Sequence, residues 1–146
     1  MAVTISTAVM TDSKALADAL VGLVPQLSRS NPPPPLEQVE AMIAHEAITQ
    51  FLAREADGTI VGVATLAVFP IPTGRRAWIE DVIVDEASAG QGIGALLTNA
   101  MLDHARSLGC VSVDLTSRPS REAANHLYKK LGFEPRETNV YRFTFD

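Results

Sequence analysis

The chain has 146 residues, of which 47% are hydrophobic and 20% are charged. These values are typical of one soluble domain with its own core, so we expect a single domain over residues 1–146. The formal net charge of −5, without a basic run, argues against nucleic acid or an anionic membrane as the main partner. Cys110 is the only cysteine, which excludes a disulfide framework, and no stretch reads as a signal or membrane helix, so we expect a cytoplasmic protein.

The N-terminal part reads as a strand followed by two helices. Residues 3–9 alternate apolar and polar side chains, as a half-buried strand does. Thr11 or Asp12 can cap the next helix, which carries leucines at helical spacing. Consecutive prolines in residues 28–35 exclude a helix or a central strand there, and residues 36–43 return to helical spacing.

Two strands joined by a tight turn follow. Residues 49–54 and 59–69 are strand-like, and they flank Asp57 and Gly58, a dipeptide that favours a hairpin turn. The two strands should therefore be antiparallel neighbours. Glycine and proline in residues 70–74 then turn the chain into the next strand.

The next segment changes from strand to glycine turn to helix. Its β-branched run, residues 82–84, suits a buried strand, yet the acidic pair Glu80 and Asp81 stands directly before this run. A carboxylate is unusual in a buried strand, so Glu80 and Asp81 are candidates for a functional role. Glycines occupy every second position of residues 90–94, and an amphipathic helix follows that Gly109 would end.

The glycine loop, residues 90–94, is predicted to cradle an anion. Glycines leave main-chain N–H groups free to point inward, and the start of a helix adds unsatisfied donors and a positive dipole end. A Walker phosphate loop would need lysine and a hydroxyl where the chain has Ile93 and Gly94, which argues against an NTPase. Asp114 suits a dinucleotide fingerprint but the glycine spacing does not, so a nucleotide-binding oxidoreductase is the weaker alternative.

The C-terminal part predicts a strand, a helix and a closing strand. Residues 110–115 form a short apolar strand, and Ser120 and Gly132 mark the start and the end of the helix. Residues 133–145 are expected to close the sheet. Because a helix joins residues 78–84 to the 110–115 strand, these two strands should be parallel, with a right-handed crossover, while the others are antiparallel.

Residues 89–94 resemble the acyl-coenzyme A loop of the GNAT superfamily of N-acetyltransferases, whose motif is Arg/Gln-x-x-Gly-x-Gly/Ala. Residues 120–133 are similar to the helix that ends the family's cofactor site. The resemblance implies an α/β fold in which helices flank a mixed, mostly antiparallel sheet, and coenzyme A lies between two splayed central parallel strands. Ala89 stands where the family usually carries Arg or Gln, which removes one cofactor contact and leaves open a catalytically silent acyl-CoA sensor.

Glu80 is the candidate for the base that takes a proton from the attacking amine, and Asp81 is the alternative. In a regular strand the two side chains point to opposite faces, so only one can look into the cleft. A carboxylate with a pKa near ~4.3 is a poor base for an ammonium near ~10, so this base needs burial or a bridging water. The alternative without function is that both carboxylates face solvent or pair with Arg75 and Arg76.

The resemblance assigns further roles. It makes Tyr128 the proton donor to the leaving thiolate and Asn125 a cofactor contact, whereas without it a tyrosine on this helix reads as core packing. Main-chain groups of residues 82–84 would serve the oxyanion and the cofactor amide if the splay frees them. The expected cofactor-binding residues are Val82, Ile83, Val84, Ala89, Gly90, Gln91, Gly92, Ile93, Gly94, Ala95 and Asn125.

The sequence therefore predicts an N-acetyltransferase that moves an acetyl group from acetyl-CoA directly to a primary amine in a ternary complex. The three histidines share no ligand spacing, so we expect no metal. The acceptor stays open between small-molecule and peptide amines, and residues 79–81 resemble the glucosamine phosphate branch of the family. A homodimer is also left open.

Overall fold

The computed structural model describes residues 2–146, which form two compact units, one up to Thr116 and one from Ser117 to Asp146. The first unit contains a five-stranded sheet in which the strand order follows the chain. Neighbouring strands are antiparallel except for the last two, which are parallel, so the expected mixed and mostly antiparallel sheet is confirmed. The strands are β1 (Thr4–Thr7), β2 (Ile48–Arg54), β3 (Ile60–Ile71), β4 (Gly74–Val84) and β5 (Ser112–Asp114).

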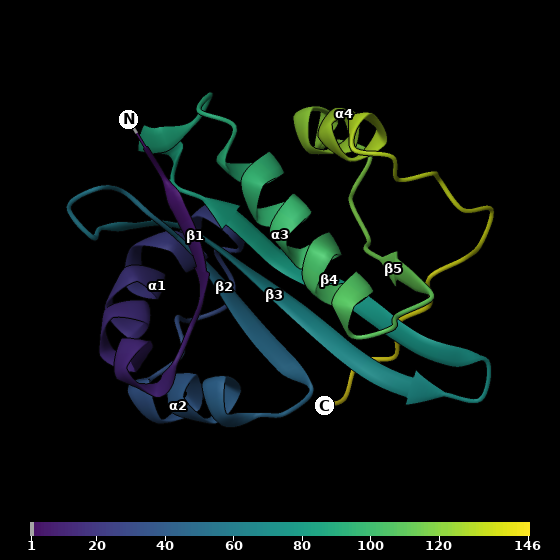
Figure 1. Ribbon diagram of the computed structural model, residues 1–146, viewed down its shortest axis with the longest axis horizontal. Coiled ribbons are helices and arrows are strands. Elements are labelled where there is room, and N and C mark those ends of the chain that lie inside the picture. Colours follow the sequence, from purple (N-terminus) through teal and green to yellow (C-terminus); the bar gives the residue numbers. More distant parts are fainter. Residues whose placement is uncertain (1) are drawn as a thin grey trace. The chain divides into compact units, whose positions relative to one another are not determined.

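Helices cover both faces of this sheet (Figure 1). Two of them, α1 and α2, pack on the face that carries Val63, and α3 packs on the face toward which Gly62 opens. No helix within residues 2–146 is both long enough and apolar enough to cross a membrane. The helices are α1 (Ser13–Leu27), α2 (Leu36–Ala44) and α3 (Ile93–Ser107) in the first unit and α4 (Glu122–Lys130) in the second, with the 3₁₀ turns η1 (Met10–Asp12) and η2 (Glu86–Ser88) ahead of α1 and α3.

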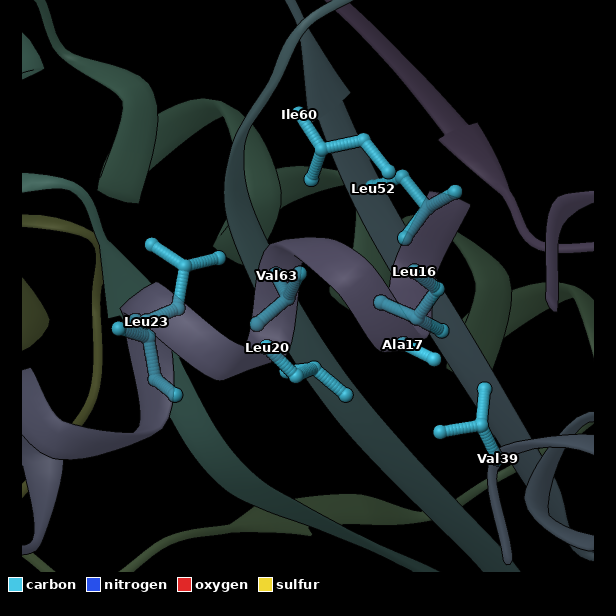
Figure 2. Close-up of a cluster of buried hydrophobic side chains, with 9 residues drawn as sticks. Leu16, Ala17, Leu20, Leu23, Val39, Leu52, Ile60 and Val63 are labelled. Atoms are coloured by element: carbon cyan, nitrogen blue, oxygen red, sulfur yellow. The ribbon is translucent and has the colours of Figure 1, made fainter. Parts of the chain in front are cut away.

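An apolar cluster holds α1 and α2 on the sheet (Figure 2). Leu16, Leu20 and Leu23 project from α1 at the spacing that the sequence predicts, and each is at most 6% exposed. Burying a leucine side chain is worth ~1.5–3 kcal/mol, so these three residues fix α1 against the sheet. The other buried members are Ala17 of α1, Val39 of α2, Leu52 of β2, Ile60 and Val63 of β3, and Ile83 of β4.

The start of α1 differs from the expected cap. Asp12 occupies the N-cap position, but its carboxylate does not cap the helix. It accepts hydrogen bonds from the main-chain N–H of Val9 and from the guanidinium of Arg54, both at 2.8 Å. A charge-assisted bond to arginine is stronger than a neutral one, so Asp12 ties the beginning of α1 to β2 instead.

The second unit is built around α4. The helix begins one residue later than expected, because its N-cap is Arg121 and not Ser120. Its end agrees with the sequence, because Gly132 has a φ of +104°, a left-handed conformation that glycine adopts at little cost. The expectation of a helix between Ser120 and Gly132 is therefore confirmed, apart from its first residue.

The expectation that residues 133–145 close the sheet is wrong. The sheet ends at β5, and the chain after α4 forms no strand. Tyr141, Phe143 and Phe145 are between 82% and 88% exposed. Their alternation with polar residues satisfies the sequence pattern of a strand, but a strand also needs a partner with which its main chain can pair, and that partner is a tertiary property.

Candidate active site

β4 and β5 pair over only a short length. Their parallel register runs from Arg76 opposite Ser112 to Trp78 opposite Asp114, where β5 ends. Residues 79–84 of β4 therefore have no ladder partner on the β5 side. This is the arrangement expected of the splayed pair, and it leaves main-chain groups of Val82, Ile83 and Val84 available at that edge. That these groups bind the cosubstrate stays a prediction.

β4 contains a bulge at its acidic pair. Glu80 lies opposite Thr65, while Ile83 lies opposite Val63, so β4 has one residue more than β3 over this stretch. Asp81 is the extra residue, with a φ of +48°. β4 is thus not the regular strand on which the expectation of opposite faces rested. Both carboxylates are exposed.

The bulge decides which face Glu80 occupies. Val63 and Ile83 belong to the cluster beneath α1 and α2, and Thr65 lies on the same face as Val63 because side chains alternate along β3. Glu80 is opposite Thr65, so its side chain lies on the α1 and α2 face. Without the bulge, Glu80 and Ile83 would point to opposite faces.

The environment of Glu80 suits a base. Loss of solvent raises the pKa of this carboxyl above its ordinary value, and the neighbouring charge of Asp81 raises the pKa further. Both effects disfavour the charged form, so the carboxylate binds a proton more readily than an ordinary glutamate does. Partial loss of solvent thus raises the pKa of Glu80 in the direction that a base requires, although the side chain stays exposed at the surface.

A row of polar side chains crosses three strands at this point. Gln50 of β2 lies opposite Thr65, which lies opposite Glu80. The Thr65 hydroxyl donates a hydrogen bond of 2.9 Å to Oε1 of Gln50, a side chain that is only 5% exposed. Sequence reasoning missed Gln50 and Thr65, although each is a polar residue within an apolar strand. The neighbouring rows on this face are apolar: Leu52, Val63 and Ile83 on one side, and Ile48, Ala67 and Trp78 on the other.

The glycine loop has the geometry expected of an anion cradle. Gly90 and Gly92 have φ values of +83° and +74°, and no atom lies within 4 Å of the place that a Cβ would occupy at either position. The N–H groups of residues 90–95 donate hydrogen bonds to no acceptor within residues 2–146. Ile93, the first residue of α3, is 2% exposed and anchors the helix start. These free donors and this open space fit the pyrophosphate of coenzyme A.

α1 holds the connector between β4 and the loop. Oε1 of Gln26 accepts a hydrogen bond of 3.0 Å from the N–H of Glu86, and its Nε2 donates to Asp85 at 3.4 Å. The Asp85 carboxylate also accepts from the N–H of Ala87, which closes the η2 turn. Gln26 is a third residue that sequence reasoning missed, since its partners lie far along the chain.

The remaining loop positions contribute main chain more than side chain. Ala89 is exposed, and its N–H donates to the carbonyl of Glu86 at 3.2 Å. Its methyl group offers no polar contact in place of the family's usual Arg or Gln. Gln91 is exposed, and Ala95 is half-buried in the first turn of α3.

Tyr128 and Asn125 lie on α4 in the second unit. Tyr128 is 9% exposed, and its ring meets that of Phe133 edge-on at 5.7 Å. Burial raises the pKa of its phenol, and the charge of Arg121 opposes this shift in part. Nδ2 of Asn125 donates to the carbonyls of Arg118 and Arg121, so this amide group also fixes the turn that precedes α4.

A pocket of about 500 Å³ lies within the second unit, and Asn125 forms part of its wall. The hydroxyl of Ser117, which also lines the pocket, is buried without a hydrogen-bond partner within residues 2–146. Within the same residues, no three His, Cys, Asp or Glu side chains form a group that could hold a metal ion. The other lining residues are Pro119, Glu122, His126, Lys129 and Pro135.

Comparison with known proteins identifies the class to which this fold and loop belong. The model of the acetyltransferase (GNAT) family matches residues 20–133, and the chain therefore belongs to this family. A glucosamine 6-phosphate N-acetyltransferase of Trypanosoma brucei brucei is 39% identical over an alignment of 116 residues, which covers 73% of this chain and 77% of that protein. An aminoglycoside N(6′)-acetyltransferase type 1 of Stenotrophomonas maltophilia is 30% identical over an alignment of 143 residues, which covers 94% of this chain and 90% of that one.

A solved structure supports the same assignment. The crystal structure of a Trypanosoma brucei acetyltransferase matches with a TM-score of 0.78 at 26% identity, covering 98% of this chain and 100% of that one. The chain is thus an acetyl-CoA-dependent N-acetyltransferase, with acetyl-CoA as cosubstrate and an amine as acceptor. The nucleotide-binding oxidoreductase that the glycines left as an alternative is excluded by this family membership.

Proposed function

We propose that the enzyme acetylates a primary amine of an amino sugar directly, in a ternary complex with acetyl-CoA. The observation that carries the proposal is the run of free N–H groups at residues 90–95, which follows a strand with Glu80 at a bulge. The relatives that act on glucosamine 6-phosphate and on aminoglycosides support an amino sugar as acceptor. Peptide amines form the competing acceptor class.

The loop would hold the cosubstrate by its phosphates. The N–H groups of residues 90–95 and the positive end of the α3 dipole favour negative charge, and they need no lysine for this. Acetyl-CoA supplies the acetyl group as a thioester, which an amine can attack. Gln91, Gly94 and Ala95 take part through their main chain, so the exposed methyl of Ala89 lowers affinity without removing the cradle.

Glu80 would take the proton that the amine must lose. Its raised pKa brings it closer to the pKa of an ammonium group, and the proton can pass directly or through a water. Asp81 then acts mainly through its charge, which strengthens Glu80 as a base. Asp81 as the base itself is the alternative, because both carboxylates are exposed.

The other half of the reaction needs an acid and donors for the developing oxyanion. We assign the acid to Tyr128, because burial keeps its phenol protonated and the family resemblance points to it. Main-chain N–H groups within Val82, Ile83 and Val84 would stabilise the oxyanion, and Asn125 would contact the cosubstrate. No metal enters this scheme.

We further propose a cytoplasmic homodimer that works without nucleic acid or membrane. The net charge of −5 disfavours both of these polyanionic partners. The exposed aromatic side chains of Tyr141, Phe143 and Phe145 support a second copy of the chain as a partner, since apolar groups in such number favour association.

The function is tested by thiol release from acetyl-CoA with a panel of acceptors: glucosamine 6-phosphate, glucosamine, an aminoglycoside and a peptide with a free amino terminus. We expect turnover with at least one amino sugar and little with the peptide. Turnover with the peptide and with none of the amino sugars would show that the acceptor is a peptide amine. If none of the acceptors in the panel leads to thiol release, the proposed substrate class is contradicted.

Cosubstrate binding is tested separately by thermal unfolding. Coenzyme A and acetyl-CoA should raise the melting temperature, because a ligand that binds the folded state stabilises it by mass action, and NAD should not. Gly92→Val should abolish this shift, since a side chain enters the space that Gly92 leaves open and its φ of +74° disfavours valine. An unchanged shift in this variant would place the phosphates elsewhere.

A further inference from the structure

We propose that Gln50 and Thr65 are positioning residues for Glu80: Gln50 accepts the hydrogen bond of the Thr65 hydroxyl, so that this hydroxyl cannot donate to the Glu80 carboxylate. The inference rests on the proposed function, in which Glu80 is the base. It concerns residues of the first unit alone. Neither side chain belongs to the glycine loop or to the acidic pair.

The register places Thr65 between two competing acceptors. Gln50 of β2 and Glu80 of β4 are its direct neighbours on either side. Side chains opposite one another in an antiparallel pair have Cβ atoms about 4.5–5.5 Å apart, so the hydroxyl can reach either neighbour by a rotation about χ1. Its single proton can serve only one of them at a time.

The structure shows which of the two acceptors forms the hydrogen bond with the Thr65 hydroxyl. Oγ1 of Thr65 donates to Oε1 of Gln50 at 2.9 Å. Because Gln50 is only 5% exposed, water cannot easily replace this donor, and a buried acceptor without a partner is costly. The hydroxyl therefore presents lone pairs, and no proton, toward Glu80.

This direction matters because a donor to a carboxylate stabilises its charged form and weakens it as a base. The Thr65 hydroxyl, held by Gln50, offers no such stabilisation. The raised pKa of Glu80, which comes from burial and then from Asp81, agrees with a carboxylate that lacks a donor from its cross-strand neighbour. Gln50 thus acts on Glu80 through Thr65.

Other charged groups around β4 do not account for this effect. β3 has no ionisable side chain, and β5 contributes Asp114, which lies opposite Trp78. On the face of Glu80, Lys14 and Asp18 of α1 pair with one another in solvent, and α2 carries Glu37 and Glu40. On β4 itself the charged neighbours are Arg75 and Arg76, and the guanidinium of Arg76 donates to Ser112 and Thr73. The ionisable groups of α3, on the other face of the sheet, are Asp103 and Arg106, which form an ion pair, and His104, which packs on Phe51.

The test follows the Glu80 carboxyl directly by NMR in protein with ¹³C-labelled glutamate, and its resonance is assigned from Glu80→Gln. In Gln50→Leu, the freed Thr65 proton turns to Glu80, so the pKa of Glu80 should fall. The acid limb of kcat/KM should move to lower pH, and kcat at its plateau should fall. This fall should be smaller than the ~10²–10⁴-fold loss expected on removing a general base.

Variants at Thr65 separate this role from packing. Thr65→Val keeps the shape but has no proton to donate, so the pKa of Glu80 should stay as in the wild type. The double variant Gln50→Leu/Thr65→Val should then behave like Thr65→Val and not like Gln50→Leu. Thr65→Ser, which keeps the hydroxyl, should titrate as the wild type.

Two outcomes would overturn the inference. One is a Gln50→Leu protein in which Glu80 titrates as in the wild type. The other, which holds even if Gln50→Leu does not fold, is a clear rise in the Glu80 pKa in Thr65→Val, since that would show Thr65 donating to Glu80 in the native enzyme. The titration needs no turnover, so a fully active Glu80→Gln would refute the base assignment independently.

Discussion

At the scale of single residues, Asp81 shows how a strand can be adapted to chemistry. Its φ of +48° is a left-handed conformation, which costs most residues roughly 1–2 kcal/mol and is tolerated best by glycine, asparagine and aspartate. This conformation creates the bulge that brings Glu80 to the α1 and α2 face. The charge of Asp81 also raises the pKa of Glu80. One residue thus serves the geometry and the electrostatics of the proposed base.

Glu80 should make stability depend on pH in a defined direction. Its folded-state pKa lies above the ordinary value of 4.5, so its contribution to stability is fully present below that value and is lost as pH rises through the folded pKa. Glu80→Gln should therefore unfold at higher temperature than the wild type at neutral pH. The difference should vanish in acid, which thermal unfolding at several pH values would measure. A variant less stable at neutral pH would contradict this.

Tyr128→Phe separates packing from proton donation. The ring that packs on Phe133 is kept, so stability should fall by no more than the ~0.5–1.5 kcal/mol of a lost hydrogen bond. Turnover should fall within or below the ~10²–10⁴-fold range of general acid catalysis, with little change in KM for acetyl-CoA. Steady-state kinetics and urea denaturation check both. Wild-type turnover would leave Tyr128 a packing residue.

At the scale of elements, α3 approaches the sheet closely at Gly62. A Cβ at this position would lie 3.1 Å from Cγ2 of Ile93, 3.2 Å from Cδ1 of Leu97 and 3.3 Å from Cβ of Ala53. Ile93 is the first residue of α3, so the distance between this helix and β3 also sets where the proposed anion cradle begins. The absence of a side chain at Gly62 therefore bears on binding as well as on packing.

Gly62→Ala should destabilise the protein by about 1–3 kcal/mol through overpacking. It should also weaken coenzyme A binding, because α3 must move away from the sheet. Gly22→Ala is the matched control: no atom lies within 4 Å of a Cβ there, and alanine favours a helix interior by roughly 0.5–1 kcal/mol, so this variant should gain stability. Denaturation and calorimetric titration would measure both effects. A Gly62→Ala protein with wild-type stability and affinity would show that the helix yields without cost.

The connector between β4 and the loop depends on α1 through Gln26. Gln26→Ala removes the bonds to Glu86 and Asp85, so the loop should be less well ordered before binding. With roughly 0.5–1.5 kcal/mol per hydrogen bond, KM for acetyl-CoA should rise about 2–10-fold, while kcat at saturation should change little. Gln38→Ala, an exposed glutamine on α2, is the control and should leave KM unchanged. Equal KM values in the two variants would exclude a role for Gln26 in the loop.

At the scale of the whole molecule, the C-terminal segment carries three exposed aromatic side chains, which the proposed dimer would cover. Replacing Tyr141, Phe143 and Phe145 by serine should convert the proposed dimer into a monomer, as judged by light scattering. The control changes the alternate positions, Arg142→Ser and Thr144→Ser, and should leave the dimer intact because it keeps the apolar side chains. A wild-type protein that is monomeric at high concentration would refute the dimer.

Much of the fold could be predicted because it depends on short-range patterns. The leucines of α1, the Asp57-Gly58 turn and the glycine caps at Gly109 and Gly132 are local features, and the structure confirms each of them. The parallel pairing of β4 and β5 could also be predicted, because two neighbouring strands that are joined through a helix are parallel. Boundaries were less certain: β5 is shorter than its apolar run, since the ladder stops where β4 and β5 diverge.

The sequence by itself determined the order of the elements, the glycine loop and the acidic pair, because each depends on residues that are neighbours in the chain. Tertiary structure alone decided the bulge at Asp81, the polar row of Gln50, Thr65 and Glu80, and the lack of a strand partner for the C-terminal segment. These features depend on the register between strands that are far apart in sequence. Side-chain alternation reverses with a shift of one residue, so a pattern within one strand cannot show which face a residue will occupy.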